Sequence, residues 1–189
     1  PSAWLKEQGV HIGADLPANP AIVIIAVKPQ MMKAALPDVK ALGNGETLAI
    51  SIAAGTPIKI FEAMLGDQTP IVRAMPNTPA AVGRGITALI GNANVKPEDM
   101  DLAEALLLSI GQTVRLDNEG QMDAVTAVSG SGPAYVFHLV ETLAAAGEAE
   151  GLPADLAMQL AKATVGGAGA LAEDSDDTPT QLRINVTSP

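Results

Sequence analysis

An uninterrupted apolar run over residues 21–27 constrains the fold of this chain more than any other segment. Its sequence, Ala-Ile-Val-Ile-Ile-Ala-Val, is rich in β-branched side chains and contains no polar residue. A strand that faces water on one side alternates apolar and polar residues, whereas a parallel strand covered on both faces stays apolar throughout. Residues 21–27 therefore predict a buried strand of a parallel α/β sheet.

The alternation of strand and helix continues up to residue 116. Such alternation is typical of a parallel sheet whose strands are joined by right-handed helical crossovers. The predicted strands are residues 21–27, 47–52, 71–75, 85–90 and 113–116. The predicted helices are residues 31–42, 57–65 and 97–110.

The pattern changes at residue 121 and is helical from there on. The predicted helices are residues 122–128, 133–149, 153–173 and 179–186. We place the domain boundary at Asn118–Gly120, which gives an α/β domain at 1–119 and an all-α domain at 120–189. The chain starts on proline with a helix-like piece and stops at Pro189, so we expect both ends to lie within a longer chain.

Composition excludes several classes of function. The formal net charge of -10 disfavours nucleic acid and anionic membranes as partners, because both select Lys and Arg. The chain has no cysteine, which excludes disulfides and thiolate metal sites and fits a reducing compartment. No apolar run reaches membrane-spanning length, and no secretory signal opens the sequence. We therefore expect a cytoplasmic protein with no membrane partner.

The segment Ser129-Gly130-Ser131-Gly132-Pro133 joins the two predicted domains. We interpret it as a helix stop followed by a helix start, with Ser131 as N-cap and Pro133 in the first turn. The alternative is a nucleophilic serine. That alternative is weaker, since a nucleophile elbow needs Gly-x-Ser-x-Gly after a strand, whereas glycines flank Ser131 directly.

Three predicted strands end in residues suited to ligand binding. Lys28-Pro29 follows the first, Ala53-Ala54-Gly55 the second, and Pro76-Asn77-Thr78-Pro79 the third. In open α/β sheets, ligands bind beyond the carboxyl ends of the strands. A cation, a turn of small residues and a carboxamide suit a nicotinamide dinucleotide. Each also has a plainer explanation, namely a solvated lysine and ordinary turn residues.

Other signals for chemistry are weak. No Gly-x-Gly-x-x-Gly phosphate loop follows a strand, so we expect that loop, with the first βα unit, upstream of Pro1. The glycine-rich residues 165–170 lie in a helical run and indicate close helix packing. Neither His11 nor His138 has a partner at ligand spacing, and the acidic residues 174–177 lack the other ligands of a calcium loop. We predict no metal.

Five segments, in this order, resemble the pyrroline-5-carboxylate reductase family. They are residues 26–30, 51–55, 75–79, 124–137 and 186–189, and they span nearly the whole chain. The resemblance implies a Rossmann-type parallel sheet domain followed by an all-α dimerisation domain, in a homodimer that can assemble into a decamer. It also implies hydride transfer from NADPH or NADH to the imine carbon of 1-pyrroline-5-carboxylate, which gives L-proline, the last step of proline biosynthesis.

The resemblance also assigns roles to individual residues. It implies a cofactor-binding role for Ala26, Val27, Lys28, Pro29, Met75, Pro76 and Asn77. It implies a substrate-side role for Thr187 and Ser188. We also predict a substrate-side role for Ser131, because it and the free amides of the helix that starts there suit a carboxylate. The resemblance assigns no catalytic side chain within this sequence, because the group that hydrogen-bonds the imine nitrogen is expected beyond Pro189.

Two other functions remain open. One is a related two-domain dehydrogenase of the β-hydroxyacid type, which typically uses a catalytic lysine on the helix that here spans residues 133–149. That helix contains no lysine, which disfavours this alternative. The other is a non-catalytic homologue that keeps only the dimer helices.

Overall fold

The structure is a computed structural model, and it describes residues 3–13, 16–43 and 45–187. The chain divides into two compact units, Pro1–Gly130 and Ser131–Pro189, which we describe separately. This division falls later than the functional boundary predicted at residue 119, which stays a prediction.

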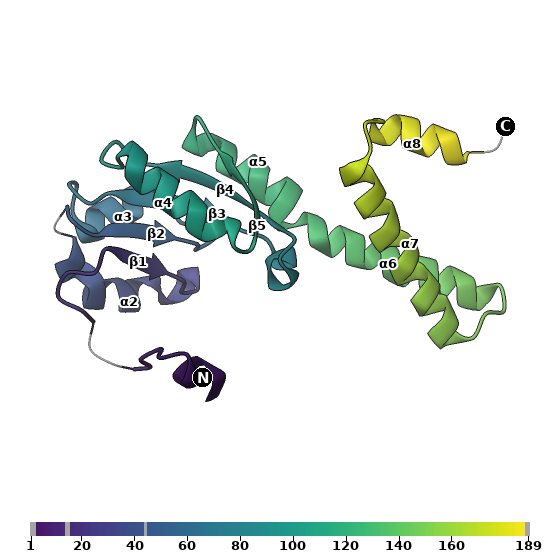
Figure 1. Cartoon of the computed structure of the whole chain (residues 1–189), viewed down its shortest axis with the longest axis horizontal. Helices are drawn as coiled ribbons and strands as arrows, with labels where there is room; N and C mark the ends of the chain where they lie inside the picture. Colours follow the sequence, from purple (N-terminus) through teal and green to yellow (C-terminus); the bar gives the residue numbers. More distant parts are fainter. Residues whose placement is uncertain (1–2, 14–15, 44, 188–189) are drawn as a thin grey trace. The chain divides into compact units, whose positions relative to one another are not determined.

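The first unit is built on a five-stranded sheet in the order β1-β2-β3-β4-β5 (Figure 1). Its strands are β1 (Ile22–Ile25), β2 (Leu48–Ser51), β3 (Ile71–Met75), β4 (Gly85–Gly91) and β5 (Gly111–Arg115). Its helices are α1 (Ala3–Glu7), α2 (Met32–Val39), α3 (Ile58–Leu65), α4 (Pro97–Leu108) and α5 (Met122–Val125). The short turns are η1 (Pro29–Met31), η2 (Lys40–Leu42), η3 (Thr78–Val82), η4 (Glu119–Gln121) and the π-helical η5 (Thr126–Gly130).

Two apolar cores form on the two faces of the sheet. On one face, Phe61 of α3 is fully buried against Ile71 and other strand residues, together with Met32 of α2. On the other face, Ala103 and Leu107 of α4 pack on β2, β3 and β4. The helices thus cover both faces, as the continuously apolar strands require.

The sheet is Rossmann-like, and its predicted parallel pairing is confirmed for three of the four strand pairs. The prediction is wrong for β3 and β4, which run antiparallel. Their connection is only residues 76–84, and it holds η3 rather than a helix that spans the sheet. A parallel return needs about a dozen residues or more, so this connection permits only the antiparallel arrangement.

The predicted helix stop and helix start are confirmed, because the π-helical η5 ends at Gly130 and α6 starts at Gly132. Neither glycine has a positive φ, so the break does not depend on a left-handed backbone. Gly130 serves close packing, because a Cβ at this position would lie 2.7 Å from Cε of Met75. Ser131 occupies the N-cap position as predicted, without a side-chain capping hydrogen bond to a described residue.

The second unit consists of α6 (Gly132–Ala149), α7 (Ala154–Asp174) and α8 (Pro179–Val186), and the predicted bounds of the last helix are confirmed. Helices α6 and α7 pack on each other through small residues: Ala144, Ala157 and Ala161 are buried, and a Cβ on Gly147 would lie 3.2 Å from that of Ala157. Many of the large apolar side chains of the unit remain exposed. They include Tyr135, Phe137, Leu139, Leu160, Leu171 and Ile184.

An exposed cluster of charges joins β5 to α4. Arg115 binds the carboxylates of Asp101 and Glu104, and Thr113 also donates to Glu104. The hydrogen bond from Arg115 lowers the pKa of the Glu104 carboxyl below its ordinary value. These contacts hold the edge strand β5 against α4, which is a structural role.

Candidate functional site at the carboxyl edge of the sheet

The carboxyl ends of β1, β2 and β3 lie at one edge of the sheet. The three strands are parallel and adjacent, with Ile25 paired to Ser51 and Ser51 paired to Arg73. Their following loops therefore meet at this edge, as the sequence predicts (Figure 1). This is the position at which open α/β sheets bind ligands.

The loop after β1 holds four of the predicted cofactor residues. Ala26, Lys28 and Pro29 are exposed and Val27 is half-buried. Lys28 has extended backbone angles and precedes η1, whose first residue is Pro29. This places a solvent-accessible cation beside the end of β1.

The loop after β2 is small and open. Ala54 and Gly55 are exposed, Gly55 has a φ of 70°, and no atom would contact a Cβ built there. The hydroxyl of Ser51 accepts the N–H of Ala53 at 3.2 Å, which fixes the start of the loop. A ligand could therefore approach the backbone closely at Gly55.

The other three predicted cofactor residues are Met75, the last residue of β3, and Pro76 and Asn77 in the loop that follows; all three are half-buried. The Asn77 side chain is engaged by the protein itself. Its Oδ1 accepts the N–H of Ile86 at 3.0 Å, and its Nδ2 donates to the carbonyl of Ser129 at 3.2 Å. Only one N–H of this carboxamide is left for a ligand, so the predicted cofactor role rests mainly on the backbone of the loop.

The predicted substrate residues lie in the second unit or outside the described residues. Ser131 precedes α6 and is half-buried. Thr187 is exposed after α8, and its hydroxyl donates to the carbonyl of Arg183 at 2.7 Å. Ser188 lies outside the described residues. Their substrate-side roles stay predictions.

The sequence predictions missed a partly buried ion pair close to this edge, in which the Glu119 side chain is 33% exposed. Arg73 of β3 is 5% exposed, and its Nη1 donates to Oε1 of Glu119 at 2.7 Å. The same carboxylate oxygen accepts the N–H of Ile58 at the start of α3, at 2.8 Å. The available signal was a single arginine in an otherwise apolar strand, since such a charge needs a partner.

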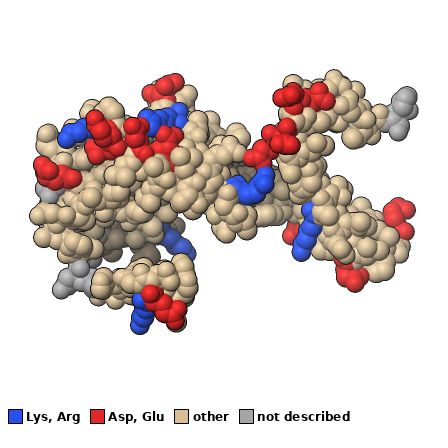
Figure 2. Space-filling view, viewed as in Figure 1, with Lys and Arg blue, Asp and Glu red and all other residues tan. Residues whose placement is uncertain are grey.

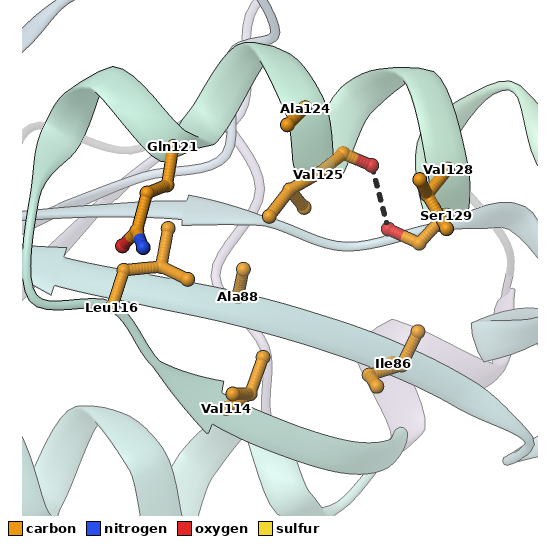
Figure 3. A pocket seen from close by; sticks show the side chains of 9 residues that line it. All are labelled: Ile86, Ala88, Val114, Leu116, Gln121, Ala124, Val125, Val128 and Ser129. Carbon is orange, nitrogen blue, oxygen red and sulfur yellow. Dashed lines mark hydrogen bonds between the residues drawn. The ribbon is translucent and has the colours of Figure 1, made fainter.

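A separate cavity of about 410 Å³ lies over β4 and β5, beneath α5 and η5 (Figure 3). Its walls are mainly apolar side chains. They are Ile86, Ala88, Val114, Leu116, Gln121, Ala124, Val125, Val128 and Ser129. None of the predicted site residues lines this cavity, and it holds no charged group that could bind a phosphate or a carboxylate.

The surface carries many carboxylates, in keeping with the net charge of -10. Acidic side chains occur on several parts of the face drawn in Figure 2, with Lys and Arg in small separate groups. Among the described residues, no cluster of His, Asp and Glu is arranged to hold a metal ion. None of the helices in the described ranges is long and apolar enough to cross a membrane.

Comparison with known proteins gives consistent matches. Residues 119–189 match the family model described as pyrroline-5-carboxylate reductase dimerisation. The pyrroline-5-carboxylate reductase of Pseudomonas aeruginosa is 44% identical over 95% of this chain and 66% of its own length. This chain thus spans slightly less than two thirds of that relative.

Two solved structures are similar in both sequence and fold. The pyrroline-5-carboxylate reductase of Coxiella burnetii has a TM-score of 0.89 at 36% identity, covering 98% of this chain and 70% of that one. The pyrroline carboxylate reductase of Plasmodium falciparum, solved with NADP bound, has a TM-score of 0.81 at 36% identity, covering 89% and 64%.

A Rossmann-like sheet with three loops at its carboxyl edge is followed by a helical region that matches a dimerisation model. The protein therefore belongs to the class of two-domain proteins that combine a Rossmann-like domain with an all-α dimerisation domain. Within that class, the chain belongs to the pyrroline-5-carboxylate reductase family.

Proposed function

We propose that this protein reduces 1-pyrroline-5-carboxylate to L-proline, with NADPH or NADH as the reductant. The observation that carries the proposal is the sequence identity of 36–44%, over 89–98% of this chain, to proteins named pyrroline-5-carboxylate reductase or pyrroline carboxylate reductase. The β-hydroxyacid alternative lacks its expected lysine on α6. A non-catalytic homologue would have no need of an accessible carboxyl edge.

The carboxyl edge fits a dinucleotide. Lys28 offers a cation for a phosphate, and the open backbone at Gly55 allows close approach. The segments 26–29 and 75–77 would hold the cofactor, and the bound cofactor would supply a hydride to the imine carbon. The part left to the protein is to bind the substrate carboxylate, to orient the ring and to hold a proton donor at the imine nitrogen.

The roles of the two domains follow from the same proposal. Residues 1–119 would bind the dinucleotide, and residues 120–189 would form the dimer and provide the substrate side through Ser131, Thr187 and Ser188. The match to a dimerisation model and the exposed apolar side chains of α6 support a homodimer. Further assembly to a decamer and a cytoplasmic location belong to the proposal as well.

The function is tested by following NADPH and NADH oxidation with 1-pyrroline-5-carboxylate, using the complete natural protein. We expect saturable oxidation that requires the substrate and yields L-proline in equal amount. A dimer that binds neither dinucleotide and produces no proline would overturn the proposal in favour of the non-catalytic homologue. Turnover of a β-hydroxyacid instead would favour the other alternative.

Replacing Lys28 with methionine tests the cation at the edge. We expect KM for the dinucleotide or for the substrate to rise roughly five- to tenfold, because one charge-assisted hydrogen bond is lost. The control is Lys40→Met, since Lys40 lies in η2, after the C-terminal end of α2, and is also exposed. Unchanged affinity and turnover in Lys28→Met would remove Lys28 from the site.

A further inference from the structure

The carboxamide of Asn77 joins two segments that lie far apart in the chain. It accepts the N–H of Ile86 at the start of β4 and donates to the carbonyl of Ser129 in η5, across 52 positions of sequence. Asn77 itself lies two residues beyond β3, in the loop predicted to face the dinucleotide. One side chain of the cofactor-side loop therefore contacts both β4 and the region matched to dimerisation.

The sequence explains why the Ser129 carbonyl needs a donor from outside its helix. In an α-helix this carbonyl would accept the N–H four residues further on, and that residue is Pro133, which has none. A partly buried carbonyl without a donor is costly. The Nδ2 of Asn77 supplies the missing donor.

The π-helical turn is held in place by further contacts. The hydroxyls of Thr126 and Ser129 donate to the carbonyls of Met122 and Val125, at 2.8 and 3.1 Å. Gly130 leaves room for Met75, whose Cε would otherwise meet a Cβ at 2.7 Å. The Met75–Asn77 loop thus contacts two consecutive residues of η5, by a hydrogen bond and by packing.

We propose that Asn77 is a positioning residue that couples the Met75–Asn77 loop to η5, at the start of the dimerisation region. This inference rests on the proposed function, in which that loop binds the dinucleotide. Asn77 acts through the backbone of its loop rather than as a ligand for the cofactor. Because coupling between two sites is reciprocal, a bound dinucleotide should slow amide exchange in residues 126–130.

The chain offers a matched control in Asn92. Its Oδ1 accepts the N–H of Ile71 at 3.1 Å, and its Nδ2 donates to the carbonyl of Thr69 at 3.0 Å. Ile71 begins β3, so Asn92 makes the same kind of bridge at the opposite end of the strand. Asn92→Ala removes these two bonds, together with the bond from Nδ2 to Glu62 and the bond from the N–H of Asn94, without touching the carboxyl edge.

Two variants at Asn77 separate the two bonds. Asn77→Ala removes both, whereas Asn77→Asp keeps an acceptor for Ile86 and loses the donor to Ser129. In the complete protein we expect both variants to lower kcat at least tenfold and to speed amide exchange in 126–130 at least tenfold. Asn92→Ala should lower the melting temperature at least as much as Asn77→Ala, because it removes more hydrogen bonds, while its kcat and dinucleotide KM stay within twofold of wild type.

The outcomes distinguish this inference from the proposed function. Wild-type kcat and wild-type exchange over 126–130 in Asn77→Asp would overturn the coupling, as would equal kinetic losses in Asn92→Ala. A wild-type protein that makes no proline would overturn the proposed function. In that case the coupling would be tested by amide exchange in residues 126–130 alone, compared between Asn77→Asp and Asn92→Ala with and without NADPH. Faster exchange in Asn77→Asp only would support the coupling.

Discussion

Replacing Glu119 with alanine is expected to lower the free energy of unfolding of the first unit by about 3 kcal/mol, the lower end for a broken buried pair, because the Glu119 side chain is 33% exposed. The substitution leaves the guanidinium of Arg73 buried, at 5% exposure, without its carboxylate partner. It also removes the acceptor for the N–H of Ile58 at the start of α3. Urea unfolding followed by circular dichroism measures the loss as a lower transition midpoint.

Two companion variants show which part of this loss comes from the charge. Glu119→Gln keeps an oxygen acceptor for Ile58 and Arg73, so a smaller loss is expected. The double variant Arg73→Met with Glu119→Leu removes both charges, and it should recover part of the stability, because a buried pair replaced by apolar residues is often neutral. A wild-type midpoint for Glu119→Ala would show that the ion pair contributes nothing to the fold.

The sheet was predictable because its strands carry a local signal. Residues 71–75 form β3 as predicted, and the apolar run 21–27 contains the shorter β1. The direction of β4 was not predictable from apolar content, since a strand covered on both faces reads the same in either direction. The short connection 76–84 held that information, because its length excludes a helical crossover.

The edge loops of the site were predictable for a similar reason. Parallel strands place their carboxyl ends together, so Lys28, Gly55 and Asn77 had to share one edge. The partners of their side chains were not predictable. Arg73 and Glu119 are 46 positions apart in the sequence, and a local sequence pattern does not show which distant residues will be in contact. Pro133 indicates that the carbonyl of Ser129 lacks its helical donor, but the sequence does not show that Asn77 supplies one.

Replacing Phe137 with glutamate is expected to raise the dissociation constant of the proposed homodimer at least 100-fold, equivalent to about 2.8 kcal/mol. Helices α6 and α7 use small residues such as Ala144 and Ala157 for their mutual contact, which leaves Tyr135 and Phe137 70% and 59% exposed. An apolar surface of this kind marks an interface, and a buried carboxylate without a partner would oppose it. Sedimentation equilibrium over a range of protein concentrations measures the change.

The matched control for Phe137→Glu is Gln68→Glu, which adds the same charge at an exposed turn of the first unit. This control should keep the wild-type dissociation constant, because Gln68 lies outside the region matched to dimerisation. Circular dichroism of Phe137→Glu should retain the helical signal, since Phe137 is 59% exposed. A folded variant that sediments as the wild-type dimer would place the interface elsewhere on the chain, and the exposed face of α6 would then need another partner.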